Sequence, residues 1–84
     1  MSVRVRFFAA ARECAGAGTI DIDLGDSRTV ADLIARLGRV RGPELAATLS
    51  ATGMRFAVNL ELVEPHAPIA DGDEVAFMPP VTGG

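Results

Sequence analysis

Two side chains of this sequence could take part in covalent chemistry. Cys14 could be a nucleophile if a neighbouring cation, Arg12, favoured its thiolate form. His66 is the one histidine, and it lies far away in the sequence between Pro65 and Pro68, so no relay between the two side chains is visible. We therefore interpret Cys14 as a small residue tucked under a loop and His66 as an exposed residue of a surface turn.

The acidic residues 71–74, Asp-Gly-Asp-Glu, could suggest a metal site. They lack the spaced oxygens and the distal glutamate of a loop-type calcium site. A single cysteine and a single histidine also cannot supply the several ligands of a thiolate or zinc site. We expect no metal and no bound cofactor in this chain, and we interpret residues 71–74 as a tight turn that leads into a strand.

The C-terminus offers a different kind of chemistry, that of the main chain itself. Its last six residues are Pro79, Pro80, Val81, Thr82, Gly83 and Gly84. The two prolines prevent further strand pairing, so the residues after them should project as a flexible, extended arm. Without Cβ atoms, the two glycines could enter a narrow channel and bring the α-carboxylate close to a partner's active site. The simpler alternative is a frayed terminus.

Composition indicates that one small domain positions this arm. The chain has 84 residues, of which 49% are hydrophobic, and a net charge of −3. A chain of this length buries only about 60% of the surface that its unfolded form exposes, so a deep catalytic pocket is hard to enclose. We therefore predict one domain over residues 1–78, a tail over residues 79–84, and a function on a surface or at a terminus.

Charge and hydropathy exclude two classes of partner. Eleven acidic residues outweigh eight arginines, and no basic stripe could displace counterions from a nucleic acid. No run of about 20 apolar residues could span a membrane, and the N-terminus has no secretory pattern. Because a single cysteine also fits a reducing compartment, we expect a cytoplasmic protein without nucleic-acid or membrane partners.

Alternating apolar and polar residues predict strands over 3–8 and 19–24. They should pair antiparallel, with arginines opposite aspartates on a wet face. The Ala- and Gly-rich segment between them is expected to be a short helical turn and a loop rather than a regular element. Thr29 to Asp32 resembles a capping box that begins a helix, and we expect Asp32 and Arg36 to form a surface pair and Gly38 to end this helix.

The remaining elements are a shorter helix and three more strands. Pro43 can occupy the first turn of the helix, and the strands are predicted over 55–59, 60–63 and 74–78. The order predicts an α+β fold of the β-grasp type, with a mixed sheet of about five strands crossed by one main helix. The expected core consists of Val3, Val5, Phe7, Ile20, Ile22, Leu33, Ile34, Leu37, Phe56, Val58, Val75 and Phe77.

Some apolar residues should point away from this core. The alternation sends Phe8 and Met78 to the opposite face of the sheet, and Leu62 is a third candidate. Single exposed apolar residues are ordinary, but three that lie together beside a tail are typical of a docking patch.

Three stretches of the sequence resemble a known family. Residues 5–13 read Val-Arg-Phe-Phe-Ala-Ala-Ala-Arg-Glu, residues 57–59 read Ala-Val-Asn, and residues 71–84 read Asp-Gly-Asp-Glu-Val-Ala-Phe-Met-Pro-Pro-Val-Thr-Gly-Gly. Together they resemble the ubiquitin-like sulfur carriers of the MoaD/ThiS type, and within that family most closely the sulfur-carrier subunits of molybdopterin synthase. Met78 stands where the family often has an aromatic residue.

The resemblance implies that the reactive atom belongs to the terminus and that the isolated chain is not an enzyme. A ubiquitin-activating-like enzyme would use ATP to adenylate Gly84, and a sulfur donor would then form a thiocarboxylate. The tail would enter the large subunit of molybdopterin synthase, in a heterotetramer of two small and two large subunits, and pass sulfur to the cyclic pyranopterin monophosphate precursor. Phe8, Arg12, Leu62 and Met78 match positions that dock on these partners.

Other destinations for the terminus remain open. The carrier could supply sulfur for thiamine thiazole, cysteine or tRNA thiolation, or its tail could be joined to a protein lysine. A non-covalent β-grasp interaction module is a third alternative.

Overall fold

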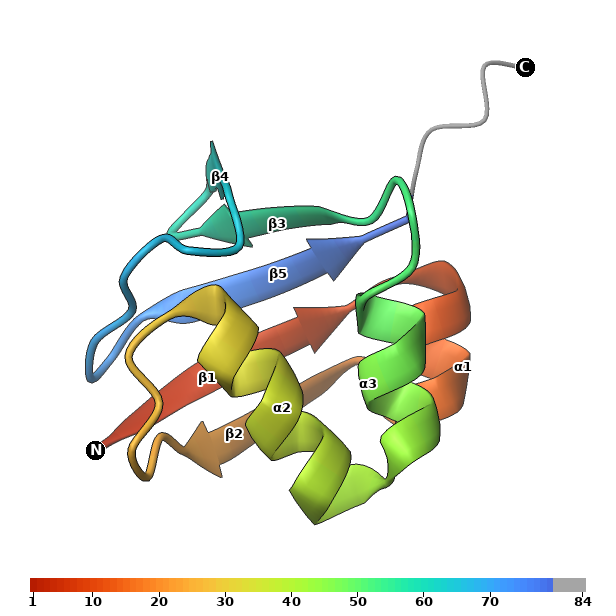
Figure 1. Cartoon of the computed structure of the whole chain (residues 1–84), viewed down its shortest axis with the longest axis horizontal. Coiled ribbons are helices and arrows are strands. Elements are labelled where there is room, and N and C mark those ends of the chain that lie inside the picture. The colour runs from red at the N-terminus through yellow and green to blue at the C-terminus, as the bar shows by residue number, and fades with distance from the viewer. Residues whose placement is uncertain (80–84) are drawn as a thin grey trace.

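The computed structural model describes residues 1–79, so the predictions for Pro80, Val81, Thr82, Gly83 and Gly84 lie outside the described residues. Eight elements follow one another along the chain: β1 (Ser2–Phe7), α1 (Ala9–Ala15), β2 (Thr19–Asp23), α2 (Val30–Arg41), α3 (Pro43–Leu49), β3 (Arg55–Val58), β4 (Glu61–Val63) and β5 (Glu74–Met78). Figure 1 shows α2 crossing the sheet, with α1 and α3 near the end toward which β1 and β5 point.

The five strands form one mixed sheet in the order β2-β1-β5-β3-β4. β1 pairs antiparallel with β2 and parallel with β5, which brings the first and last strands of the chain together at the centre. β3 pairs antiparallel with both β5 and β4. This sheet and its crossing helix confirm the predicted ubiquitin-like β-grasp fold. The expected cross-strand pair is also present, since Arg4 Nε lies 3.3 Å from Asp21 Oδ1.

The main helix begins where the capping box predicted. Thr29 accepts a hydrogen bond from the backbone N–H of Asp32, and the Asp32 carboxylate accepts one from that of Thr29. The expected pair between Asp32 and Arg36 is not the contact that forms. Arg36 instead donates from Nε to the main-chain oxygen of Asp23, which fixes the helix to the end of β2.

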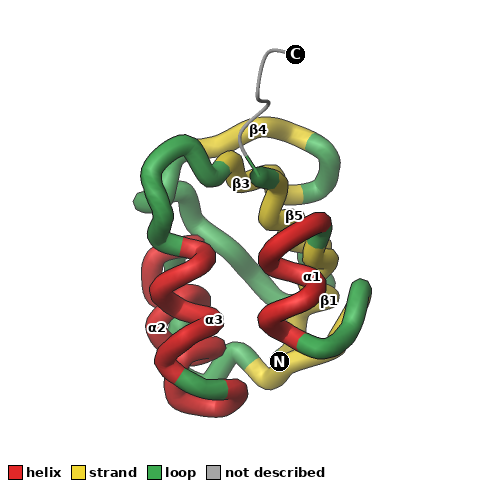
Figure 2. Tube along the Cα trace, turned by 90° about the vertical axis from the view of Figure 1, so that its right-hand side faces the viewer, coloured by secondary structure: helices red, strands yellow, loops and turns green. Residues whose placement is uncertain are grey.

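The prediction that Gly38 ends this helix is wrong, because α2 continues to Arg41. Gly38 is required for a different reason: a Cβ atom there would lie 2.7 Å from the Cβ of Ala46 in α3. The two helices, seen side by side in Figure 2, therefore approach each other through a position without a side chain. Pro43 begins α3 as expected, and Leu45 and Leu49 are buried.

The segment after β1 is more regular than predicted. Residues 9–15 form the helix α1, which buries Ala11 and Ala15 on one side and ends at Gly16 in the left-handed conformation. Alanines spaced four residues apart bury little area individually, so their pattern is a weak sequence signal. In this fold the two small side chains let α1 pack closely against α3 and β1.

The core lies between the sheet and the helices, and Phe77 occupies its centre. Its ring stacks on Phe7 at a centroid distance of 6.0 Å and meets Phe56 edge to face at 5.8 Å. Of the expected core residues, Ile20, Phe56 and Val58 are only half-buried and pack at its margin. The cluster includes seven residues that the prediction omitted: Ala11, Ala15, Leu24, Val30, Leu45, Leu49 and Ile69.

Candidate functional site

The turn Asp71–Glu74 fixes the start of β5 against its neighbour β1. Ser2 donates its backbone N–H to Asp71 Oδ1 at 2.8 Å, and Gly72 donates its N–H to the Ser2 oxygen at 2.8 Å. Arg4 N–H reaches the Asp73 oxygen at 3.0 Å, which continues the pairing into the strand. The interpretation of these residues as a tight turn is therefore confirmed, and the Asp71 and Asp73 carboxylates accept hydrogen bonds that join the turn to neighbouring segments.

Asn59 joins the same turn from the β3–β4 hairpin. Its Nδ2 donates to Asp73 Oδ1 at 3.0 Å, and its Oδ1 accepts from the backbone N–H of Glu74 at 3.0 Å. The backbone adds a third bond, from Asn59 N–H to the Glu74 oxygen at 2.8 Å. Two separate stretches that carry the family resemblance, 57–59 and 71–74, thus meet in one hydrogen-bonded structure that positions β5.

The β3–β4 hairpin differs from the prediction, in which two strands, 55–59 and 60–63, followed each other without a connection. Asn59 and Leu60 have φ of 50° and 72°, so they form the two-residue connection between Val58 and Glu61 instead of extending the strands. Asparagine adopts this left-handed conformation at low cost, whereas leucine does not. Leu60 is also 88% exposed.

The far end of β5 leads to the tail. Phe77 pairs with Phe7 on one side and Phe56 on the other, and Met78 is opposite Arg55. Pro79, the last described residue, is half-buried directly after the strand. Because β5 is held on both sides and at its start, the centre of the sheet fixes the position of Pro79.

Three of the four predicted docking residues lie on the outer face of the sheet, the face opposite the helices. Phe8 continues β1 in an extended conformation and is 39% exposed, and Leu62 is 64% exposed. Met78 is half-buried on the same face, since the register alternates it with the core residue Phe77. Between them lie two small residues, Ala76 and Ala57, which are opposite each other on β5 and β3. We call Phe8, Ala57, Leu62, Ala76 and Met78 the apolar patch.

Arg12, the fourth predicted docking residue, lies beside this patch rather than in it. It is exposed on α1, and its guanidinium lies next to Gly18 in the connection that leads to β2. Gly18 accepts the backbone hydrogen bond of Phe7, the last residue of β1. Arg12 therefore belongs to the same end of the sheet as Phe8 and Pro79.

The two residues with reactive side chains, Cys14 and His66, lie in different parts of the fold. Cys14 is exposed on α1, so the interpretation of it as a residue tucked under a loop is wrong, while His66 is exposed in a turn as expected. Within residues 1–79, no three His, Cys, Asp or Glu side chains come close enough to hold a metal ion. None of the helices there is long and apolar enough to cross a membrane.

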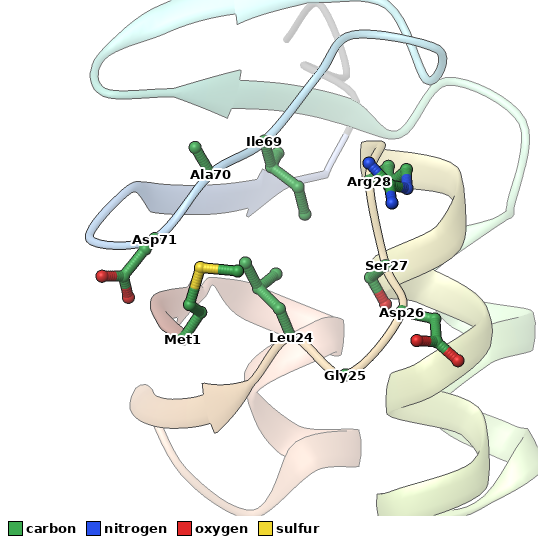
Figure 3. A pocket seen from close by; sticks show the side chains of 9 residues that line it. All are labelled: Met1, Leu24, Gly25, Asp26, Ser27, Arg28, Ile69, Ala70 and Asp71. Carbon is green, nitrogen blue, oxygen red and sulfur yellow. The ribbon is translucent and has the colours of Figure 1, made fainter.

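The opposite end of the sheet carries a small hollow of about 230 Å³. Figure 3 shows Met1, Leu24 and Ile69 on its apolar side, with Asp26, Arg28 and Asp71 among the polar residues around it. Its position at the start of β1 and β5 places it away from Pro79. It is also smaller than the pockets that usually enclose a small molecule.

Comparison with known proteins identifies the family to which this arrangement belongs. The model of the ThiS family matches residues 5–84, from the first strand to the terminal Gly-Gly. The chain belongs to the ThiS family. A curated relative from Escherichia coli (strain K12), described as a molybdopterin synthase sulfur carrier subunit, is 39% identical over 98% of this chain and 99% of its own.

Two kinds of solved structure share the ThiS-family fold of this chain. SAMP1 from Haloferax volcanii is 29% identical and superposes with a TM-score of 0.83 over 100% of both chains. A chain from a complex of subunits 1 and 2 of molybdopterin-converting factor from Helicobacter pylori is 26% identical, with a TM-score of 0.64 over 100% of both chains. The relatives therefore confirm the family and the fold.

Sequence reasoning did not identify the roles of three residues: Asn59 at the start of β5, and Arg6 and Arg55 on the outer face of the sheet. The hydrogen bond from Asn59 to Asp73 joins residues 14 positions apart, and no local sequence pattern predicts it. Arg6 and Arg55 could have been found, because the alternation that sends Phe8 and Met78 outward places both arginines on the same face.

Proposed function

We propose that this chain is the sulfur carrier subunit of a molybdopterin synthase. One observation carries the proposal: the full-length likeness to relatives described by that name, which includes the sequence through the terminal Gly-Gly. The fold is consistent with it, because the hydrogen-bonded turn and the central position of β5 place Pro79, the last described residue, next to Met78 of the apolar patch.

The chemistry would take place at the α-carboxylate of Gly84. A carboxylate is a poor acyl donor, so one of its oxygens attacks the α-phosphorus of ATP, pyrophosphate leaves, and an acyl-adenylate forms. A sulfur nucleophile then displaces AMP to give the thiocarboxylate. The thiocarboxylate sulfur then attacks a carbon of the cyclic pyranopterin monophosphate precursor, and an oxygen substituent leaves that carbon as the new carbon–sulfur bond forms. Water adds to the Gly84 carbonyl carbon, the bond between that carbon and the sulfur breaks, the sulfur stays on the precursor, and the Gly84 carboxylate is restored.

Two partners would handle the terminus in turn. A ubiquitin-activating-like adenylyltransferase binds the ATP, and the large synthase subunit binds the precursor, so this chain needs neither a catalytic side chain nor a bound cofactor. The Helicobacter pylori complex of subunits 1 and 2 supports a large-subunit partner. We extend this to a cytoplasmic heterotetramer of two small and two large subunits, without nucleic acid or membrane.

The domain and the tail would have different roles. Residues 1–78 are the domain that partners recognise, through Phe8, Leu62, Met78 and the nearby Arg12. Residues 79–84 are the arm that reaches the active sites of the partners. Pro79, Pro80, Val81, Thr82 and Gly83 would enter the partner's active-site channel, and Gly84 would carry the sulfur.

A second function is favoured by the likeness to two crystal structures of the small archaeal modifier protein 1 from Haloferax volcanii, both with a TM-score of 0.83. In that case the activated Gly84 would acylate an amine of another protein. Supply of sulfur to a different pathway is compatible with the same first two steps.

Mass spectrometry of the intact chain tests the proposal. The chain is incubated with its activating enzyme, ATP and a sulfur source, and we expect the mass to rise by one oxygen-to-sulfur exchange. A variant without Gly84, or with residues added after it, should keep the fold but show no exchange. Molybdopterin formation by an extended variant would contradict the proposal, and covalent adducts with other proteins in place of molybdopterin would favour the modifier function.

A further inference from the structure

Two arginines border the apolar patch on the outer face of the sheet. Arg6 is opposite Ala76 in the pairing of β1 with β5, and Arg55 is opposite Met78 in the pairing of β3 with β5. Both side chains are exposed. The patch therefore has a guanidinium on each side of its central strand.

Arg6 is held against the patch by two contacts. Its guanidinium carbon lies 5.5 Å from the centre of the Phe8 ring, in the geometry of a cation–π contact. Its Nη1 also lies 3.7 Å from Glu74 Oε1, with the Arg6 side chain still 45% exposed. A pair of this length and exposure leaves most of the hydrogen-bonding capacity of the guanidinium available to a second carboxylate.

Arg55 is less restrained. No carboxylate of residues 1–79 lies within 4 Å of its guanidinium. Together with Leu62 and Glu64 it lines a shallow hollow of about 240 Å³ at the β4 side of the patch. Its positive charge is therefore offered at the surface beside two of the predicted docking residues, Leu62 and Met78.

Charge is distributed unevenly along this face. At the start of β1 and β5 the carboxylates of Asp21, Asp71 and Asp73 gather, and Arg4 is paired with Asp21 there. Nearer the end of β5 lie Arg6, which is paired with Glu74, and Arg55, which lines its hollow together with Glu64. A chain with a net charge of −3 thus presents two exposed guanidinium groups at the border of the apolar patch.

We infer that Arg6 and Arg55 select a partner whose apolar docking pocket is bordered by acidic side chains, and that the large synthase subunit is that partner. The inference rests on the proposed function. Charges at the border of an interface mainly steer encounter and reject mismatched partners, since opposed like charges are costly. The two arginines would therefore decide which large subunit is bound, while the apolar patch supplies the contact area.

Binding kinetics with the large subunit from the same organism test this inference. Arg6→Glu and Arg55→Glu reverse the two charges, and Arg55→Gln removes one without reversing it. Arg39→Glu is the matched control, because Arg39 is an exposed arginine of α2 in the helix layer. Thermal unfolding of every variant confirms that the fold is kept.

We expect each charge reversal to lower the association rate constant by about tenfold in dilute salt, with a smaller loss at high salt. Arg55→Gln should have an intermediate effect, and Arg39→Glu should behave as the original chain. If the original chain binds but both reversals leave its association rate unchanged, the inference is wrong and the proposed function stands. If the original chain does not bind the large subunit at all, the proposed function fails and the inference with it.

Discussion

Asn59 and Asp73 are joined side chain to side chain, with Asn59 Nδ2 donating to Asp73 Oδ1 at 3.0 Å. This contact connects the β3–β4 hairpin to the turn that precedes the central strand β5. Asp73 Oδ2 in turn accepts a hydrogen bond from the backbone N–H of Ala70 at 2.8 Å. One carboxylate therefore bonds both to the β3–β4 hairpin and to the residue that precedes the turn. The acidic residues that suggested a metal site are thus part of the frame that positions the last strand.

Replacement of Asn59 should show how much this frame contributes. Asn59→Gly keeps a residue that tolerates positive φ but removes both side-chain hydrogen bonds, so we expect a loss of about 1–3 kcal/mol in the free energy of unfolding. Asn59→Ala should cost more, because it adds backbone strain to the same loss. Urea unfolding measures the free energy of unfolding of both variants. If Asn59→Gly is as stable as the original chain, the side-chain bonds contribute nothing.

Replacement of the neighbouring Leu60 by glycine should increase the stability of the domain. It is 88% exposed and has a φ of 72°, a conformation that costs a side chain with a Cβ about 1–2 kcal/mol. Leu60→Gly should therefore stabilise the domain by up to about 1 kcal/mol once the greater flexibility of unfolded glycine is subtracted. Leu60→Ala is the control, since it removes the apolar side chain but keeps the strain. A higher melting temperature for both variants would attribute the gain to lost apolar exposure instead.

The contact of α2 with α3 can be tested by a double-mutant cycle. Gly38→Ala places a Cβ 2.7 Å from that of Ala46, and we expect a loss of about 1–3 kcal/mol despite the better helix propensity of alanine. Ala46→Gly alone should cost about 1 kcal/mol. Combined with Gly38→Ala it should recover most of the first loss, because the collision is removed. Additive losses in the double variant would show that the two positions do not interact.

Gly38 also shows where local sequence patterns stop being informative. The pattern from Val30 to Leu37 predicts the helix and its apolar face correctly, because both depend on residues within a few positions of one another. Whether a glycine ends a helix or admits a neighbouring helix depends on what approaches it in space. Ala46 does so from another element, and no periodicity in the sequence reveals that approach.

The same distinction applies to the placement of the predicted docking residues in the fold. The alternation in β1 and β5 places Phe8 and Met78 on the outer face, as the structure has them. The position of Arg12 beside Gly18 instead follows from a helix that the sequence pattern did not indicate. Its two buried alanines carry too little apolar surface to stand out in composition.

Acid should reveal the role of the capping box at the start of α2. The backbone N–H groups of Arg28 and Thr29, together with the Thr29 hydroxyl and the Arg28 charge, hold the pKa of Asp32 below its ordinary value. Because the lowered pKa belongs to the folded state, the stabilisation is fully present above the ordinary pKa of about 3.9 and is lost as the pH falls through the folded value.

Melting temperatures as a function of pH check this expectation. Asp32→Ala should melt lower than the original chain at neutral pH, and the difference should shrink as the pH drops below about 4. Thr29→Ala, which removes the other half of the box, should cost about 1 kcal/mol at neutral pH. Asp26→Ala serves as the control for the loss of one surface carboxylate. A gap between Asp32→Ala and the original chain that widens in acid would have the wrong sign for this account.

The apolar patch predicts a separation of binding from stability. Leu62 is 64% exposed on β4, so Leu62→Ala should change the free energy of unfolding by less than about 0.5 kcal/mol. If Leu62 docks in a pocket of the large subunit, the same change should weaken binding by about tenfold or more. Val40, 58% exposed on α2, offers a matched control in Val40→Ala. Calorimetry measures the affinity of both variants for the large subunit. If Leu62→Ala and Val40→Ala bind equally well, Leu62 is not a docking residue, and Phe8 at the end of the sheet is the next residue to test.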